Sequence, residues 1–334
     1  MLRSQGDLAP APMTHPMRIL SYNVRYFGHA TRGLASTRAA MHRIAAAVAA
    51  LDPLPAIVCL QEVETRSLRS TVAHRHSETQ LERFSSMLSE ALVGAGKPDA
   101  YEAYYFPAHA YRISARTHVY TTGLAILAHR SFVVDQHNAR TPHDITHRRL
   151  HAIRGVKQTR ICAHVRLRRQ ASRAPVDVFN THLSLPSALA REFWTQPRRL
   201  GWGRNQLEEA RNLARFVERE RASDRFVVVG DFNALPGSPV YDALVREHGW
   251  VDAFAHRYRL GVDELASWPT AGFMRMRMHL DHVFCGPGLR WSDFDGTHPF
   301  GDRTGPFHGL SDHTPMVGRC RVARESSPPR ESRP

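Results

Sequence analysis

The chain has 334 residues, with 45 Lys and Arg against 31 Asp and Glu, which gives a formal net charge of +14. Its hydrophobic fraction of 42% is ordinary for a globular protein and too high for a disordered chain. No apolar stretch approaches the roughly 20 residues that span a bilayer, and the N-terminal segment lacks the apolar run of a secretory signal peptide. A membrane-spanning protein and an exported precursor are therefore disfavoured, and we expect a cytoplasmic protein.

The cysteines are widely spaced and mostly flanked by apolar residues. They are Cys59, Cys162, Cys285 and Cys320. This spacing fits no zinc ribbon and no redox motif. It predicts buried, reduced thiols and disfavours a disulfide scaffold.

The two ends of the chain differ in composition from the middle. Residues 1–16 are rich in Ala and Pro, and residues 323–334 contain the polar run RESSPPRESRP, so both are expected to be disordered tails. Between them there is no internal repeat and no low-complexity linker. A single catalytic domain over residues 17–322 is the predicted organisation.

Short apolar runs predict a series of strands along this domain. In chain order they cover residues 18–24, 56–63, 122–128, 159–167, 176–183, 225–233, 280–285 and 314–322. Apolar residues at helical spacing predict helices over 36–51, 78–93 and 204–221, and another begins after Pro239 and ends before Gly249. Two packed sheets with helices outside are the expected architecture. The stretch 63–121 has room for an insertion.

Polar residues occupy the ends of these apolar strands. They are Asn23, Glu62, His182, Asp231, Asn233, Asp281, Asp312 and His313. A buried carboxylate at a strand end is costly unless it is paired or binds a metal ion. Taken singly, each residue has a structural alternative: Asn23 as a turn cap, His182 as a strand histidine with its hydrogen bonds satisfied, Asp312 as a turn residue. Together they predict that several strands deliver side chains to one site.

The spacing within one motif has a chemical sense. In an extended segment Asp231 and Asn233 point to the same side, while Phe232 points into the packing. A carboxylate beside an amide can orient a water molecule and hold a phosphate oxygen. A histidine such as His313 beside a carboxylate such as Asp281 can donate a proton or hydrogen bond to a pentacovalent phosphate.

The ordered motifs resemble a known family. LSYNV, LQEV, NTHLS, VVGDFNALPGSPVY, LDHVF and LSDHTPM follow one another, and they are similar to the successive motifs of the endonuclease/exonuclease/phosphatase superfamily, with the DNase I-like fold. The resemblance covers roughly residues 17–322. It implies an α/β protein in the form of a four-layer sandwich, with two mixed sheets flanked by helices. The site would lie at one edge, where strand ends from both halves converge.

The resemblance also implies a metal site. Glu62 is similar to the family's metal-binding glutamate and Asn23 to the asparagine beside it, and Asp312 would be a second carboxylate on the metal side. The family uses Mg²⁺ or Mn²⁺, and a hard cation of this kind prefers oxygen ligands.

The remaining roles are carried over by motif. Asp231 would orient or deprotonate the attacking water, and Asn233 would hold a phosphate oxygen. His313, oriented by Asp281, would stabilise the charge that develops on phosphorus. His182 would contact the scissile phosphate or assist the leaving group.

The sequence departs from some branches of the family. Secreted DNases pair the histidine of the THL motif with an upstream glutamate, and Glu102 does not occupy that position, so the partner that orients His182 stays open. Abasic-site repair enzymes carry a tyrosine motif where this chain has NTHLS. The motifs look more like the broad group of deadenylases, sphingomyelinase-like enzymes and inositol-phosphate enzymes.

Charge placement points to an anionic substrate. Residues 140–173 contain ten Lys and Arg and a single acid, Asp144, which is typical either of a solvated loop or of a surface that attracts a polyanion. In FMRMRMHLDH the apolar and polar residues alternate, so Arg275 and Arg277 would share the face of Asp281. One of these arginines could bind a non-scissile phosphate or anionic head group, or both could be solvated on an outer face.

These features predict a metal-dependent phosphodiesterase that attacks phosphorus with an activated water. No serine or cysteine sits in a nucleophile motif. Nucleic acid is the leading substrate, so the enzyme would be nuclease-like, and a lipid or inositol phosphoesterase is the alternative. A catalytically inactive binding module is disfavoured because the strand-end residues are intact.

Overall fold

The computed structural model describes most of the predicted catalytic domain. The described residues are 16–29, 37–64, 79–112, 118–147, 159–169, 174–186, 199–273, 276–295 and 305–323. Apart from Pro16 and Ala323, the two expected tails lie outside the described residues.

The first of two large sheets is mixed, because β1 and β2 run parallel and the other neighbours are antiparallel. In spatial order its strands are β14 (Leu289–Phe294), β15 (Met316–Val322), β1 (Met17–Asn23), β2 (Ile57–Glu64), β4 (His118–His129) and β3 (Tyr101–Arg112). Asn23 lies opposite Gln61 in the β1–β2 register, so both strands end at the same edge.

The second sheet is also mixed, with β8 parallel to β9. Its strands in order are β10 (Val251–Asp252), β13 (Asp281–Cys285), β9 (Phe226–Asp231), β8 (Val176–His182), β7 (Ile161–Arg169) and β5 (Phe132–His137), and β6 (His143–Asp144) pairs with β7. β11 (Ala271–Phe273) and β12 (Met276–Met278) form a separate two-stranded antiparallel sheet.

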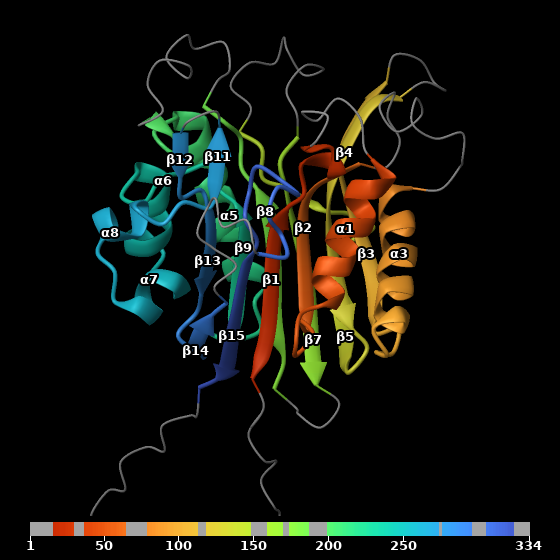
Figure 1. Cartoon of the computed structure of the whole chain (residues 1–334). Coiled ribbons are helices and arrows are strands. Elements are labelled where there is room, and N and C mark those ends of the chain that lie inside the picture. Colours follow the sequence, from red (N-terminus) through yellow and green to blue (C-terminus); the bar gives the residue numbers. More distant parts are fainter. Residues whose placement is uncertain are drawn as a thin grey trace, which may run out of the picture.

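Helices cover the outer faces of both sheets (Figure 1). α1 (Arg38–Ala49) and α3 (Gln80–Gly94) cover the first sheet. The other side carries α5 (Arg204–Glu220), α6 (Pro239–Asp242) with its π-helical continuation (Ala243–Glu247), α7 (Ala253–Tyr258) and α8 (Val262–Ala266). The layers are therefore helix, sheet, sheet, helix.

Side chains that point alternately to the two faces of each strand explain the four layers. In β1, Leu20 and Tyr22 pack with α1 and α3, while Ile19 belongs to the core between the two sheets. In β8, Phe179 faces outward and stacks on His164, with its ring edge toward Phe216 of α5. Because successive side chains of a strand point to opposite faces, each sheet buries both of its faces. The predicted four-layer sandwich of two mixed sheets is confirmed.

The predicted elements are found, and the structure adds others. The stretch 63–121 holds α3 and β3, which complete one side of the first sheet, so it is part of the fold. The prediction of one alternating strand ending in HLDH was wrong. β12 ends at Met278 and β13 begins at Asp281, because the N–H groups of Leu280 and Asp281 both donate to Thr270 Oγ1 at 2.9 Å.

All four cysteines are buried and unpaired, as predicted. Within the described residues, no helix is both long enough and apolar enough to cross a membrane.

Candidate active site

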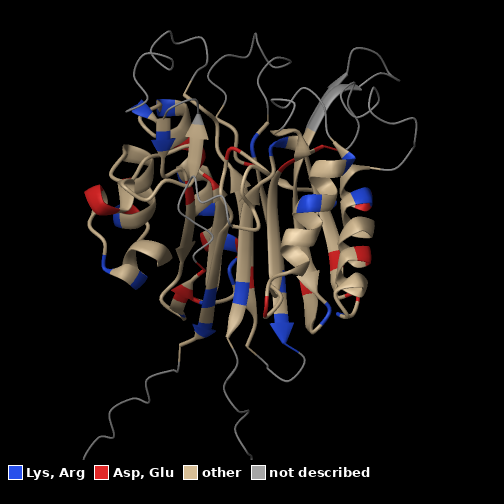
Figure 2. Ribbon diagram, in the orientation of Figure 1, with Lys and Arg blue, Asp and Glu red and all other residues tan. Residues whose placement is uncertain are grey.

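The candidate site lies where strands of both sheets end, and one carboxylate oxygen is at its centre. Asp231 closes β9, and its side chain is buried. Asn23, at the end of β1, donates from Nδ2 to Asp231 Oδ2 and to Glu62 Oε1, both at 3.1 Å. This amide therefore joins the two sheets at the catalytic edge. Figure 2 shows acidic residues at the upper ends of the central strands.

A β-bulge places Glu62. Leu60 lies opposite Ala125 of β4 and Val63 lies opposite Gly123, so two residues of β2 face a single position of β4. Glu62 itself has a φ of 57°, in the left-handed region that non-glycine residues rarely adopt. Bulges re-aim side chains next to functional sites, and here the extra residue turns Glu62 toward Asn23 and Asp231.

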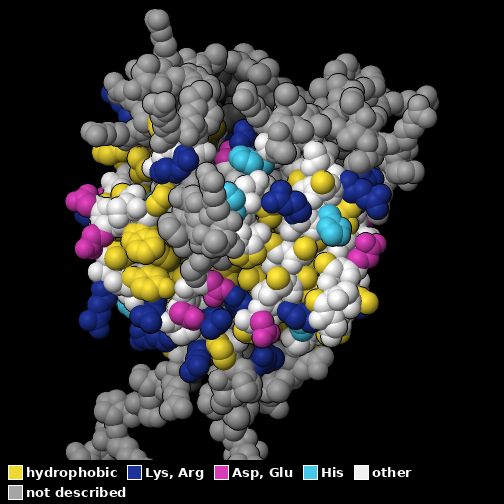
Figure 3. Space-filling view, viewed as in Figure 1, with side chains coloured by type: hydrophobic (Ala, Val, Ile, Leu, Met, Phe, Trp, Pro, Cys, Tyr) yellow, Lys and Arg dark blue, Asp and Glu magenta, His cyan; other side chains and the backbone are white. Residues whose placement is uncertain are grey.

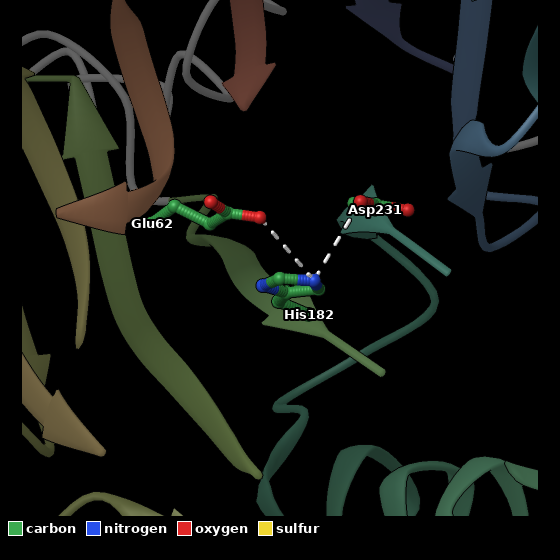
Figure 4. A group of neighbouring side chains, drawn as sticks. All are labelled: Glu62, His182 and Asp231. Atoms are coloured by element: carbon green, nitrogen blue, oxygen red, sulfur yellow. Dashed lines mark ion pairs between the residues drawn. The ribbon is translucent and has the colours of Figure 1, made fainter. Parts of the chain in front are cut away.

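His182 lies beside these two carboxylates (Figure 4). Its Nε2 is 3.9 Å from Glu62 Oε1 and 3.6 Å from Asp231 Oδ2. Burial lowers the pKa of His182 well below its usual value, and the charges of Arg160 and His313 lower it further. The ring is therefore neutral at physiological pH. Glu102 lies on β3, opposite Ala128 of β4 and at the other end of the sheet, so it does not orient this ring.

His313 is positively charged, in contrast to the neutral His182. Its Nδ1 is 2.9 Å from Asp281 Oδ2, and its Nε2 is 3.7 Å from Asp231 Oδ2. Burial opposes protonation of this ring, but the carboxylates of Asp281 and Asp231 outweigh burial and raise the pKa of His313. The site therefore presents one neutral and one charged imidazole on either side of Asp231.

The segment from Asp231 to Asn233 is not extended as predicted, because β9 ends at Asp231 and Asn233 has a left-handed φ of 48°. The loop that follows β9 holds Asp231 in place. The backbone N–H of Asn233 donates to Asp231 Oδ1 at 2.9 Å, and Asn233 Nδ2 donates to Leu183 O at 2.9 Å. Gly230 has a φ of 149°, and a Cβ there would lie 2.0 Å from Thr181 O of β8. Only glycine allows β9 to approach β8 this closely beside His182.

Asp312 is placed differently from the other carboxylates. Its Oδ2 is 2.5 Å from Arg25 Nη1, and Arg25 follows β1 in a left-handed turn with a φ of 44°. The preceding Ser311 donates from Oγ to Asn23 O at 2.8 Å. Asp312 is thus tied to the end of β1, and its carboxylate is already paired with an arginine that the motif analysis did not single out.

Arg160 is a second cation at the site, which the sequence placed in the basic segment 140–173 but not among the site residues. It donates from Nε to Ser184 Oγ at 3.2 Å and from Nη1 to His182 O at 3.5 Å. With Glu62 and His182 it lines a small cleft. Arg160 directly precedes β7, and β7 pairs with β8, the strand that leads into the NTHLS motif. This position was the sequence signal that could have placed Arg160 at the site.

Two other described arginines of the basic segment lie apart from Arg160. Arg166 pairs with Asp177, and Arg168 with Asp135, further along β7 and away from the site. Residues 148–158 and 170–173 lie outside the described residues, as does Arg275. Arg277 is exposed on β12, and the strand paired with β12, β11, bridges to His313 through Ala271.

The donor set fits a hard divalent cation. Ligand atoms of Glu62, His182 and Asp231 lie within 4.8 Å of one another, and those of Asp231, Asp281 and His313 form a second such group. Burial raises the pKa of Glu62, against the opposing hydrogen bond from Asn23, and burial also raises that of Asp231, against the opposing charge of His313. Burial thus disfavours the charged form of both carboxylates, and a divalent cation bound beside them would favour it. Their oxygens are the ligands that Mg²⁺ and Mn²⁺ prefer.

The fold and this site define a phosphoester hydrolase of the DNase I-like class. The model of the endonuclease/exonuclease/phosphatase family matches residues 20–313, and the chain belongs to that family.

Solved structures share the fold at low identity. The catalytic domain of human Nocturnin, solved with a bound sulfate anion, is 17% identical, with a TM-score of 0.60 over 94% of this chain and 96% of that one. An endonuclease/exonuclease/phosphatase from Beutenbergia cavernae DSM 12333 is 18% identical, with a TM-score of 0.62 over 92% and 72%. ANGEL2, described as a 2′,3′-cyclic phosphatase, is 16% identical, with a TM-score of 0.57 over 93% and 97%. No curated protein sequence matches the chain.

Proposed function

We propose that the protein is a Mg²⁺- or Mn²⁺-dependent phosphodiesterase that uses an activated water, with nucleic acid as its leading substrate. The observation that carries this proposal is the environment of Asp231 Oδ2. Asn23 Nδ2 lies 3.1 Å from this oxygen, and the Nε2 atoms of His182 and His313 lie 3.6 and 3.7 Å from it. A cytoplasmic location is part of the proposal, since four buried, unpaired cysteines are compatible with a reducing compartment.

Each group has a defined task in this scheme. Asp231 holds the attacking water and accepts its proton. His313, kept charged by Asp281, donates a hydrogen bond to the phosphoryl oxygen on which negative charge develops. His182 contacts the scissile phosphate from the other side, and Asn233 holds a phosphate oxygen near Asp231. A divalent ion held by Glu62 and Asp231, with Asn23 and Asp312 nearby, would supply charge neutralisation at the phosphate.

Three observations support a nucleic-acid substrate. The chain has a net charge of +14. Arg25 and Arg160 flank the carboxylates from opposite sheets. One fold relative, ANGEL2, was solved with adenosine-2′,3′-vanadate. Cationic side chains beside a site raise the local concentration of a polyanion.

One observation favours an anionic lipid or inositol phosphate as the alternative substrate. Apolar side chains gather over α7 and α8 on the face seen in Figure 3. Tyr258, Val262 and Trp268 there are 41%, 40% and 47% exposed. An exposed apolar patch of this kind is typical of a contact with another surface, including a membrane surface.

Nicking of supercoiled plasmid tests the substrate class. We expect nicking in Mg²⁺ or Mn²⁺, and none when EDTA removes the metal. Bis(p-nitrophenyl) phosphate serves as a small diester in parallel. If the protein hydrolyses the small diester but leaves the plasmid intact, the substrate is RNA, a lipid or an inositol phosphate, to be decided with each in turn. If it hydrolyses none of these, the inactive binding module is the correct description.

Arg160 should contribute to the affinity for the phosphate backbone. We expect Arg160→Ala to raise KM for plasmid by about tenfold, since a hydrogen bond to a charged group contributes roughly 1.5–3 kcal/mol. Arg277→Ala should raise KM less and leave kcat unchanged, because its side chain is exposed on β12. Arg168→Ala is the matched control, since Arg168 pairs with Asp135 away from the site. Equal KM values for all three variants would contradict this assignment.

A further inference from the structure

A layer of buried polar side chains lies directly beneath the active site. Ser21 of β1, Gln61 of β2 and Asn180 of β8 are 2%, 0% and 0% exposed. Each precedes a site residue on its own strand: Ser21 lies two residues before Asn23, Gln61 one before Glu62, and Asn180 two before His182. The layer therefore lies within the same three strands that carry Asn23, Glu62 and His182, one or two residues before these site residues.

These side chains bond to one another across the two sheets. Gln61 Nε2 donates to Asn180 Oδ1 at 2.7 Å and to Ser21 Oγ at 3.2 Å. Asn180 Nδ2 donates to Leu60 O at 3.0 Å and to Ala125 O at 3.2 Å. Asn180 belongs to the second sheet, whereas Gln61, Leu60 and Ala125, with which its side chain bonds, belong to the first. The two amides thus form a bridge between the sheets.

The bridge lies at the bulge that aims Glu62. Leu60 and Ala125 are the last regular pair before the bulge, and Asn180 holds both of their carbonyl groups. Leu60 and Val63 pack toward α1 and α3, while Cys59 belongs to the core between the sheets. The inserted residue lets Gln61 and Glu62 both face inward, Gln61 toward Asn180 and Glu62 toward Asn23. Asn180 and His182 share the inner face of β8 by alternation.

Packing alone does not account for this layer. An amide placed in a protein core is unfavourable unless its hydrogen bonds are made. Gln61 Oε1 is buried and has no hydrogen-bond partner within the described residues. Apolar side chains of the same shape would fill this space at little or no loss of stability. Hydrogen bonds, unlike apolar contacts, are directional. The hydrogen bonds of this layer can therefore hold the two sheets at a fixed separation.

We propose that Gln61 and Asn180 are positioning residues for the active site. Their amide bridge fixes the separation of the two sheets at the catalytic edge, and with it the placement of Glu62 relative to His182 and Asp231. This role rests on the proposed function, since it concerns the same site. The bridge touches no substrate, so it acts only through the residues that it places.

Replacement of the bridge by apolar residues of similar size tests this role. The variants are Gln61→Met, Asn180→Leu and the double variant, and the matched control is Val178→Ala, on the same face of β8 but two residues further from the site. For each, kcat and KM for bis(p-nitrophenyl) phosphate, the Kd for Mn²⁺ by calorimetry and the midpoint of urea unfolding are measured.

We expect kcat to fall and the Kd for Mn²⁺ to rise by about 10–100-fold in the bridge variants, since residues that orient metal ligands commonly have effects of this size. KM should change little. The double variant should lose no more activity than the worse single variant, because either substitution already breaks the bridge. Val178→Ala should lower the unfolding midpoint but keep the wild-type kcat and Kd.

Unchanged kcat and Kd in the double variant would overturn the proposal, as would equal losses in Val178→Ala. A wild-type protein without phosphodiesterase activity would refute the proposed function instead. In that case the comparison of Kd for Mn²⁺ decides the positioning role: weaker binding in the bridge variants alone supports it, and equal binding refutes it.

Discussion

Asp231→Asn is expected to lower kcat for phosphodiester hydrolysis by about a thousandfold, within the range that a general base contributes. The substitution removes the carboxylate oxygen that Asn23, His182 and His313 surround. An asparagine still accepts the backbone hydrogen bond from Asn233, so the loop after β9 should keep its conformation. Multiple-turnover kinetics in Mn²⁺, together with urea unfolding, measure the two effects separately.

Asp224→Asn is the matched control for this experiment. Asp224 lies in the turn before β9, is exposed, and pairs with Arg221 at the end of the strand remote from the site. Its substitution should leave kcat and KM unchanged. An Asp231→Asn enzyme that stays within tenfold of the wild-type kcat would remove Asp231 from the role of base.

Asp177→Asn is expected to lower the free energy of unfolding by about 3 kcal/mol, the size usual when one partner of a buried ion pair is removed. Asp177 is fully buried on β8. Its Oδ1 lies 2.8 Å from both His164 Nε2 and Arg166 Nε, and its Oδ2 accepts from Ala222 N at 2.8 Å. The variant keeps the shape of the side chain but faces these donors with an uncharged amide.

The pH dependence of this loss gives an independent check. Burial alone would raise the pKa of Asp177, but the hydrogen bonds from His164 and Ala222 and the charge of Arg166 outweigh burial and lower it. A lowered pKa stabilises the fold above the unfolded-state value of about 3.9, and this contribution disappears as the pH falls through the folded-state pKa. The difference between wild type and variant should therefore be constant near neutral pH and shrink below about pH 4.

Asp135→Asn distinguishes the stability effect of a buried ion pair from that of an exposed one. Asp135 pairs with Arg168 at 3.2 Å on the same sheet, but both side chains are about one-third exposed. Exposed ion pairs contribute roughly 0–1 kcal/mol. Urea unfolding should therefore show a much smaller loss than for Asp177→Asn. Equal losses would mean that the buried network around Asp177 contributes no more than a surface pair.

Local sequence patterns were sufficient for the main elements. The apolar runs that end in Asn23, Glu62, His182 and Asp231 are strands in the structure, and the helical spacing over 204–221 corresponds to α5. These predictions succeed because burial imposes a period of two on strands and 3.6 on helices. The placement of polar residues at strand ends also anticipated that they would meet, since a buried carboxylate requires partners.

Contacts between distant segments were beyond such patterns. Arg25 lies next to Asp312 although the two are far apart in the chain, and nothing near Arg25 distinguishes it from other surface arginines. The continuous alternation in FMRMRMHLDH predicted one strand, but Thr270 accepts hydrogen bonds from Leu280 and Asp281 and divides it. In both cases the deciding partner comes from another part of the fold.

The residue types of the site, their order and the strands that carry them follow from the sequence, because they depend on local burial patterns and on motifs. The aim of each side chain depends on the tertiary structure. Glu62 would face the helices if β2 were regular, and it reaches Asn23 because a bulge shifts its register against β4. Gln61 and Asn180 are distant in sequence and act together only when the two sheets pack. Register and packing arise from contacts between remote segments, and no local pattern encodes them.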